Sequence, residues 1–572
     1  ITRKAVAMSD TSPLPLSLPQ DTQPSQPLPV PVPPVREDTR RIVRAASIIS
    51  LGNVASRVLG LVRETVKADL FGATGMVSAF QVAAAVPTIL YDLLIGGIIS
   101  SALVPVFSEY TPQGRRDDLW FLVSSLMSLV TVVLAFFVLL VELFAPQVAW
   151  LLSGGLDPEP LAVTAYLLRI TVPAVLFMTL SGIFTGLLYA LRRFTLPAFT
   201  AAIFNASIVV VALVMGYRWG VASLAVGLLV GAVLQTLLQL PALRDARLRF
   251  TLNLRHPGLR RIARLYIPIG LSLVVSQLAV ALSYNLASRT GERSIAWMNY
   301  AATLIQFPLG LVATAVSVAI LPTLSRYALG DSPAEQAAFK TTLAQGLKLV
   351  LLLTIPATVG LFVLARPVIA LLFEHGDFTP YDTEHTMQAL WVALLGLVPY
   401  AVDQPLIFAF YARKDTWTPA LVGIFGVGIY LLAALGPTLV IPLTLNGLIL
   451  ANSLQLTSHA LITAYLLRRR LGGWGEHGLG SLAVRALGAS LVMGGLTWLA
   501  MRFLEDQVVR LGLGSGQVVG ELLIVGGAAG VGLITYALLM ALLRADGGVL
   551  LLLLRRRGQL GAPASERSTP SS

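Results

Sequence analysis

Charged side chains inside otherwise apolar stretches are the residues of this chain best suited to chemistry. Arg57, Arg63 and Glu64 fall in one such stretch, at residues 42–66. An arginine inside a membrane helix costs roughly 2.5–3.5 kcal/mol on insertion scales, so it usually faces a cavity or a partner. Guanidinium groups bind phosphate oxygens through paired hydrogen bonds. The pattern favours a phosphate site in an aqueous cavity, and the alternative is an internal ion pair of Arg63 with Glu64 or Asp92.

Two acidic residues in apolar segments are candidates for coupling to an ion. Asp92 is followed closely by two glycines, and Asp403 lies between two prolines. A carboxylate in a membrane can bind a proton or Na⁺, or it can merely pair with an arginine, and both alternatives stay open. Asn205 and Gln306 could line the same cavity as the arginines, although such amides more often join one helix to another.

The sequence offers no cofactor site. It contains no cysteine, which excludes disulfides, iron–sulfur clusters and thiolate metal sites. Its five histidines are scattered, and none forms a ligand pair at helical spacing. The phosphate-binding loop of ATPases and the dinucleotide-binding glycine pattern are both missing. We therefore expect neither an enzyme nor ATP-driven transport, and no cofactor or metal beyond a coupling Na⁺ or H⁺.

Composition indicates a membrane protein. Hydrophobic residues make up 56% of the 572 residues and charged residues only 12%, with a mean hydropathy of +0.78. A soluble domain carries roughly a quarter charged residues, and about 20 apolar residues suffice to cross a bilayer. The net charge of +12 does not require nucleic acid, because Lys and Arg collect in the cytoplasmic loops of membrane proteins.

The apolar segments predict an all-α fold with fourteen membrane-spanning helices. We expect a disordered Pro-rich tail at 1–40, a first lobe at 41–243, a second lobe at 244–470, two further helices within 471–547 and a tail at 548–572. The segments are 42–66, 78–109, 119–143, 161–190, 196–216, 219–243, 260–287, 295–325, 341–365, 385–411, 417–437, 441–467, 481–503 and 518–544.

Loop charges predict the orientation of the chain. Lys and Arg gather in alternate loops, such as residues 115–116, 192–193, 244–264, 413–414 and 468–470, and the loops between them hold few. Because cytoplasmic loops carry the excess of positive charge, we expect both termini in the cytoplasm.

The sequence also repeats itself. Pro105 and Tyr110 recur as Pro322 and Tyr327, and three other matches follow in the same order at a nearly constant offset. Six helices separate the copies, so both copies would have the same orientation. This predicts two six-helix lobes related by an axis along the membrane normal, with a cavity between them and two added helices at the C-terminal end.

Several motifs resemble the MurJ/MviN family of lipid II flippases over roughly residues 45–470. The resemblance is carried by Ser56-Arg57-Val58-Leu59-Gly60-Leu61-Val62-Arg63-Glu64, Phe71-Gly72-Ala73, Leu103-Val104-Pro105, Arg193 to Phe199, Trp297-Met298-Asn299-Tyr300, Phe307-Pro308, Ile320-Leu321-Pro322, Gly376-Asp377-Phe378-Thr379 and Phe410 to Asp415.

The resemblance implies a transporter of the multidrug/oligosaccharidyl-lipid/polysaccharide exporter superfamily in the bacterial cytoplasmic membrane. It implies that Arg57 and Arg63 lie near the pyrophosphate of the substrate, an undecaprenyl-pyrophosphate-linked peptidoglycan precursor, and that the last two helices hold its lipid tail. We include the adjacent Glu64, with Asn205 and Gln306, among the candidate substrate-binding residues. Partners would be this lipid, membrane lipids and cell-wall synthesis proteins, with no nucleic acid.

The chain departs from the family pattern in its second and eighth helices. Positions that usually carry charge read Ser78, Tyr91, Ala302, Thr303 and Gln306 here. The central cavity would therefore have fewer charged groups to hold the substrate's head group.

Lipid II translocation by alternating access is our leading hypothesis. The alternatives are an exporter or antiporter of another polyprenyl-linked glycan, a drug or a metabolite, and a non-transporting scaffold in cell-wall assembly. Replacing Arg57 by Ala separates them, because a scaffold should tolerate the change and a transporter should not.

Overall fold

The computed structural model describes residues 35–96, 98–111, 116–253, 255–330, 332–473, 477–511 and 518–543. The predicted C-terminal tail lies outside these residues, as does most of the predicted N-terminal tail. The described residues form helices and turns, with no β-strand among them, so the predicted all-α fold is confirmed for this part of the chain. Two compact units divide the chain, residues 1–47 and 48–572.

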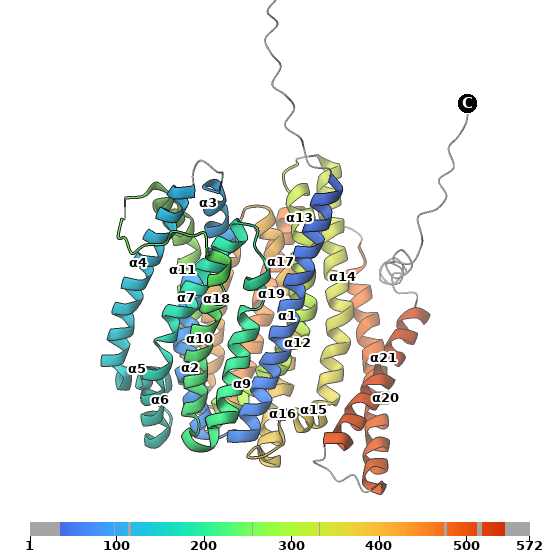
Figure 1. Cartoon of the computed structure of the whole chain (residues 1–572). Coiled ribbons are helices and arrows are strands. Elements are labelled where there is room, and N and C mark those ends of the chain that lie inside the picture. The colour runs from blue at the N-terminus through green and yellow to red at the C-terminus, as the bar shows by residue number, and fades with distance from the viewer. Residues whose placement is uncertain are drawn as a thin grey trace, which may run out of the picture. The chain divides into compact units, whose positions relative to one another are not determined.

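Helices follow one another with short connections throughout the second unit (Figure 1). As far as residue 243 they are α1 (Val35–Phe71), which begins in the first unit, α2 (Gly75–Ile95), α3 (Val104–Glu109), α4 (Arg116–Leu143), α5 (Ala145–Ser153), α6 (Pro158–Thr171), α7 (Ala174–Ala190), α8 (Thr195–Ala198), α9 (Thr200–Trp219) and α10 (Ala222–Leu237).

The remaining α-helices complete the described chain. They are α11 (Pro257–Ser288), α12 (Ser294–Pro308), α13 (Ala315–Tyr327), α14 (Pro333–Val363), α15 (Ala365–Phe373), α16 (Pro380–Leu394), α17 (Leu397–Ala412), α18 (Trp417–Leu435), α19 (Leu445–Leu471), α20 (Leu479–Arg510) and α21 (Val518–Leu542). Short 3₁₀ turns, η3 (Leu240–Leu243) and η5 (Gly436–Leu439), follow α10 and α18.

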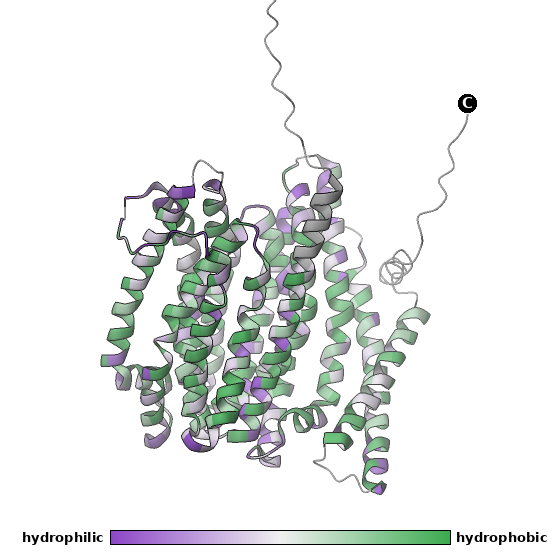
Figure 2. Cartoon of the chain, in the orientation of Figure 1, coloured by the Kyte–Doolittle hydropathy of each residue, from purple (hydrophilic) through white to green (hydrophobic). Residues whose placement is uncertain are grey.

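Nine helical spans of the described chain are long and apolar enough to cross a membrane, and two bent pairs raise the number to eleven. The pairs are α6 with α7, bent by 41°, and α16 with α17, bent by 45°. The predicted segments 42–66, 260–287 and 441–467 correspond to α1, α11 and α19, which are not among these spans; within α11, Leu273–Ser288 forms a shorter apolar helix. Figure 2 shows the apolar bodies of the helices and their polar ends. The chain is a multi-pass membrane protein.

The outward faces of several helices are apolar. On α4, Phe136, Leu139 and Leu143 are exposed, and on α21 so are Leu533 and Ile534. Contiguous exposed apolar surface marks a membrane or partner interface in a folded protein. On these faces it fits contact with lipid tails, while buried residues of both halves of the chain form the core between the helices.

Backbone irregularities recur where the sequence repeats. Arg192 and Lys414 both adopt a left-handed conformation with φ 59°, although neither is glycine. A π-helical turn also interrupts each of the equivalent spans, η1 (Ile99–Leu103) after α2 and η4 (Leu309–Thr314) after α12. Such turns are rare and occur mostly at functional sites. The local backbone therefore follows the same pattern in the two copies of the repeat.

Candidate functional site

A buried ion network lies in the second half of α1. Arg63 Nη2 and Nε lie 2.7 Å and 3.1 Å from Glu64 Oε1, and Lys67 Nζ donates to Glu64 Oε2. Glu64 is 3% exposed and Lys67 1%. Both oxygens of one carboxylate are thus occupied by cations. Of the two partners considered for Arg63, the structure shows contact with Glu64 and not with Asp92.

Neighbouring helices complete this network. Arg63 Nη1 donates to Asn205 Oδ1 at 2.9 Å, and the Asn205 amide donates to the backbone oxygens of Ser56 and Ala201. Lys67 Nζ lies 4.7 Å from the centre of the Tyr300 ring, within the range of a cation–π contact. Asn205 therefore joins α9 to α1, the role that is more common for amides in membrane helices.

Arg57 has a different environment six residues earlier on α1. Its side chain is half-buried, and its Nη1 donates to the backbone oxygen of Gln306 at 3.4 Å. No carboxylate among the described residues pairs with it. A Cβ at Gly310 would overlap the guanidinium, so the glycine of η4 makes room for the cation. Arg57 is a positive charge, and most of its five N–H donors bind no described residue, as an anion site requires.

Other predicted residues are not gathered around Arg57. The Asp92 side chain is half-buried in α2 and forms no ion pair with a described residue. Ser78 is fully buried and accepts a hydrogen bond from the Ala296 N–H at 3.3 Å. The Gln306 side chain is exposed, so Gln306 approaches Arg57 through its backbone alone.

Positions 91, 302 and 303, where the family pattern has charge, are also neutral and half-buried in the structure. Thr303 Oγ1 donates within its own helix to the backbone oxygen of Asn299 at 3.0 Å. None of Tyr91, Ala302 and Thr303 makes a polar contact with Arg57 or Arg63 among the described residues.

Asp403 has a partner that the sequence analysis missed. His459 of α19 places Nδ1 2.8 Å from Asp403 Oδ2 of α17. The other oxygen, Oδ1, is buried and has no hydrogen-bond partner among the described residues. A Cβ at Gly423 of α18 would lie 3.9 Å from His459 Nε2. The carboxylate is therefore only half satisfied, in contrast to Glu64.

One end of the helix bundle is closed by interlocking turns. The Asp377 N–H donates to the Asp69 backbone oxygen at 2.9 Å, and the Tyr300 hydroxyl donates to the Gly72 backbone oxygen at 2.9 Å. Gly72 and Gly376 have φ of 62° and 54°, and a Cβ on either would overlap a backbone oxygen of the opposite turn. Only glycine suits both the left-handed conformation and this close approach.

Further hydrogen bonds join the two halves of the chain at this end. Gln81 Nε2 donates to Asn299 Oδ1 at 3.1 Å, and the Gly155 N–H donates to Ser288 Oγ at 3.1 Å. With the glycine turns and the Ser78–Ala296 bond, these contacts link α1, α2 and the turn after α5 to α11, α12 and the turn after α15. The end of α1 that carries Lys67 is thereby tied to the second half of the chain.

Two ion pairs brace loops at the opposite end. Arg193 donates to Asp245 at 2.7 Å and 3.0 Å, and these hydrogen bonds hold the pKa of the Asp245 carboxyl below its usual value. Asp415 accepts from Thr418 N and Oγ1 at 3.0 Å and 2.6 Å, and from Arg470. Burial alone would raise the pKa of Asp415, but these hydrogen bonds outweigh it, so its pKa is also lowered.

Known proteins resemble this chain over most of its length. A family model described as lipid II flippase MurJ matches residues 67–512. A lipid II flippase MurJ from Burkholderia cenocepacia is 32% identical over 476 residues, which cover 81% of this chain and 91% of that protein. A probable lipid II flippase MurJ from Haemophilus influenzae is 31% identical, covering 77% of this chain and 89% of that protein.

Solved structures share the fold. A lipid II flippase MurJ in an inward closed conformation superposes with a TM-score of 0.71 at 24% identity, covering 87% of this chain and 99% of that one. An inward-facing multidrug resistance transporter of the MATE family superposes with a TM-score of 0.58 at 14% identity, covering 73% and 94%. At these identities the likeness concerns the arrangement of helices.

Proposed function

This chain belongs to the lipid II flippase MurJ family, and from that premise we propose that it carries lipid II from the inner to the outer leaflet of the bacterial cytoplasmic membrane. Transport would proceed by alternating access, with the binding cavity open to one side of the membrane at a time. The observation that carries the proposal is the cation of Arg57, which no described carboxylate neutralises, in a chain that matches the family over most of its length.

Arg57 is the proposed contact for the pyrophosphate of the lipid. A guanidinium keeps its charge at every physiological pH and offers paired N–H donors that match phosphate oxygens. Arg63 would be the second contact, since its side chain is 33% exposed even though it already binds Glu64 and Asn205. Glu64 would hold Arg63 in position rather than touch an anionic substrate.

The architecture we propose has fourteen membrane-spanning helices, with α1, α11 and α19 added to the eleven apolar spans. Two six-helix lobes would hold the cavity between them, and α20 and α21 would form the added pair. The matched φ of Arg192 and Lys414 supports the repeat on which the lobes rest. The excess of Lys and Arg in alternate loops supports cytoplasmic termini.

Alternating access would require the closed end to open. The hydrogen bonds of Asp377 with Asp69 and of Tyr300 with Gly72 would break when substrate leaves toward the outer leaflet. Because Lys67 and Tyr300 contact each other beside this closure, a charge change at the α1 network would reach it directly. Asp92 and Asp403 remain the proposed sites for a coupling proton or Na⁺.

Translocation in proteoliposomes tests the proposal. We expect the wild-type protein to move fluorescent lipid II between leaflets, and Arg57→Ala to slow this step about 10- to 150-fold, because a charged hydrogen bond contributes roughly 1.5–3 kcal/mol. Arg218→Ala, which removes an exposed arginine of α9, is the matched control and should leave the rate unchanged.

Three results would count against the proposal. A wild-type protein that moves no lipid II would contradict the substrate, and a protein that moves drugs instead would identify an exporter. If Arg57→Ala restores growth of cells depleted of their own flippase as well as wild type does, Arg57 is not a substrate contact, and a scaffold fits better.

A further inference from the structure

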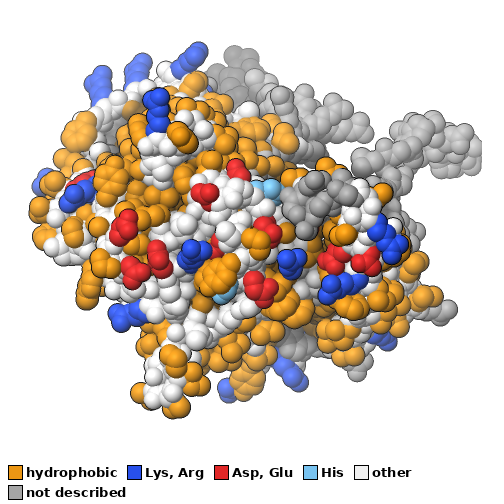
Figure 3. Space-filling view, turned by 90° about the horizontal axis from the view of Figure 1, so that it is seen from below, with side chains coloured by type: hydrophobic (Ala, Val, Ile, Leu, Met, Phe, Trp, Pro, Cys, Tyr) orange, Lys and Arg blue, Asp and Glu red, His pale blue; other side chains and the backbone are white. Residues whose placement is uncertain are grey.

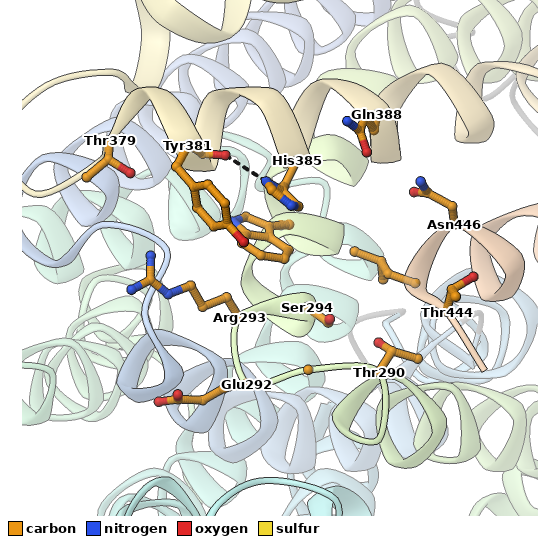
Figure 4. A pocket seen from close by; sticks show the side chains of 13 residues that line it. Thr290, Glu292, Arg293, Ser294, Thr379, Tyr381, His385, Gln388, Thr444 and Asn446 are labelled. Carbon is orange, nitrogen blue, oxygen red and sulfur yellow. Dashed lines mark hydrogen bonds between the residues drawn. The ribbon is translucent and has the colours of Figure 1, made fainter. Parts of the chain in front are cut away.

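A cavity of about 820 Å³ opens at the closed end of the bundle, among the first turns of α12, α16 and α19 (Figure 4). Ligand pockets in proteins commonly measure roughly 300–1,000 Å³. The cavity is separate from Arg57, which does not line it. Figure 3 shows the face on which α16 begins, where acidic side chains gather near the middle.

One wall of the cavity is aromatic. The His385 ring stacks on Trp297 with ring centres 4.4 Å apart, and Tyr381 lies 4.1 Å from the same His385 ring. Tyr381 is 57% exposed, so one face of its ring remains available. The face of an aromatic ring carries negative charge density and attracts the positive edges of C–H groups. Such a wall suits a ring-shaped ligand with C–H groups on one side.

The wall is held rigidly by a buried carboxylate. Asp382, 1% exposed, accepts from Trp297 Nε1 at 3.0 Å and from Arg293 at 3.3 Å. It also accepts from the backbone N–H and hydroxyl of Thr379, the N-cap residue of α16. Four donors thus fix the Trp297 ring to the first turn of α16. Binding sites need this kind of support, because loosely held side chains lose entropy when they bind.

Neutral polar groups face the same space. His385 Nδ1 lies 2.9 Å from the Tyr381 backbone oxygen, which can only accept, so in the neutral ring Nε2 is left as an acceptor. The Asn446 amide makes no hydrogen bond with a described residue, and the Gln388 carbonyl is left over after its amide donates to Glu384 at 3.0 Å. Figure 4 shows these groups around the opening.

The charged side chains of the cavity do not favour an anion. Asp382 pairs with Arg293, and Glu292, which lies against Gly75 of α2, forms no ion pair with a described residue and adds negative charge. Thr379 and Thr444 use their hydroxyls to cap α16 and α19. The N–H groups that might otherwise hold an anion are therefore partly satisfied. The chemistry favours a neutral ligand rich in hydroxyl and amide groups.

We propose that this cavity binds an N-acetylated sugar of the substrate's head group on the outer side of the membrane. One sugar ring would lie on Tyr381, and its hydroxyl and acetamido groups would bond to His385 Nε2, Gln388 and Asn446. This assignment rests on the proposed function, since it takes lipid II as the substrate and the closed end as the outer one. The cavity is then an exit subsite, which receives the sugar while Arg57 releases the pyrophosphate.

Binding of the lipid-free disaccharide–pentapeptide to the full-length protein tests this assignment. Calorimetry would be done in the Arg57→Ala background, where the proposed pyrophosphate contact is missing, so that the remaining binding reports the cavity. We expect Tyr381→Ala and Asn446→Ala each to weaken binding about two- to twelvefold, as the loss of an aromatic contact or hydrogen bond does. Tyr217→Ala, an exposed tyrosine of α9, should bind like its parent.

The outcomes separate this assignment from the proposed function. Equal binding by the Tyr381→Ala, Asn446→Ala and Tyr217→Ala variants, or displacement of the probe by inorganic pyrophosphate, would overturn the sugar site even if wild-type protein translocates lipid II. Binding that depends on Tyr381 in a protein that translocates no lipid II would keep the sugar site and refute the transport proposal. If the probe binds no variant, the cavity is not a sugar site.

Discussion

Two stretches of α1 differ in whether their charged side chains are paired. Around Glu64, α1 buries an acid between two cations, and each carboxylate oxygen is occupied. Around Arg57, the same helix carries a cation whose one protein partner among the described residues is a backbone oxygen. Buried charges must be paired, whereas a charge beside an aqueous cavity can remain without a protein counter-ion and bind a ligand. The difference separates a part of α1 that stabilises the fold from a part that is free to bind.

Asp403 and His459 fall between these two cases. Their pair is buried like that of Glu64, but Asp403 Oδ1 has no donor among the described residues. An unsatisfied buried oxygen costs about 1–3 kcal/mol. Because one oxygen of this buried carboxylate has no donor among the described residues, we retain Asp403 as a proposed coupling site.

Lys67→Met should have the largest effect on stability, and it tests whether the charge pairing around Glu64 stabilises the fold. Removing the buried cation leaves Glu64 underneutralised, so we expect a loss of about 3–5 kcal/mol in unfolding free energy, read as early thermal unfolding in detergent. The double variant Glu64→Gln/Lys67→Met should regain most of that loss, because it removes both charges. If the single and double variants unfold alike, the network does not stabilise the protein through charge pairing.

Arg63→Lys sharpens the boundary between the two stretches. Lysine keeps the charge but cannot bind Glu64 and Asn205 together with a planar fork, so we expect about 1–2 kcal/mol lower stability. Translocation should slow as well, whereas Arg57→Lys should slow translocation at unchanged stability. Unfolding and translocation would be measured on both variants. If Arg63→Lys and Arg57→Lys change stability and translocation alike, the two stretches of α1 do not differ in role.

Asp403→Asn tests whether the pair of Asp403 and His459 stabilises the fold, as Glu64 does, or acts in transport, as proposed for Arg57. We expect stability to change by less than about 1 kcal/mol, because one oxygen already lacks a donor. The measurement is translocation under an imposed pH or Na⁺ gradient, whose stimulating effect should disappear in the variant. His459→Gln, which keeps a hydrogen-bond donor to Asp403, is the variant with which Asp403→Asn is compared. A gradient effect equal to that of wild type would make the pair structural.

Asp415→Asn removes an ion pair in a loop and serves as the reference outside the membrane-spanning helices. The pKa of Asp415 is lowered in the folded protein, so its contribution to stability is present above the unfolded pKa of about 4 and is lost as the pH falls through the folded value. We expect the variant to lose about 1 kcal/mol at pH 7 and to match wild type in strong acid. Unfolding curves across pH check this, and a difference that persists in acid would contradict it.

The helices could be predicted from the sequence because a bilayer demands about 20 apolar residues, a length that is easy to see. Their breaks could not all be foreseen. The segment predicted at 161–190 divides at Pro173, a residue that ends helical hydrogen bonding. The segment at 385–411 divides at Leu395 and Gly396, with no proline at the break. The π-helical turns have no sequence signal at all.

The site was only partly accessible from the sequence. Arg63 and Glu64 are adjacent, so their pairing could be considered, and Arg57 stood out as an arginine deep in an apolar segment. The contacts of Arg63 with Asn205 and of Asp403 with His459 join distant helices, and only tertiary structure brings them together. The aromatic cavity was missed for the same reason, since three separate turns supply its walls.

The interlocked turns at Gly72 and Gly376 have an evolutionary consequence. Backbone atoms, not side chains, make the bond between Asp69 and Asp377 and accept the bond at Gly72. Most amino-acid replacements at residues 69 and 377 would therefore leave the closure intact. The closure is sensitive at the two glycines, where any side chain meets the opposite turn, and at Tyr300, whose hydroxyl donates to Gly72. Selection should therefore conserve the two glycines more strictly than residues 69 and 377.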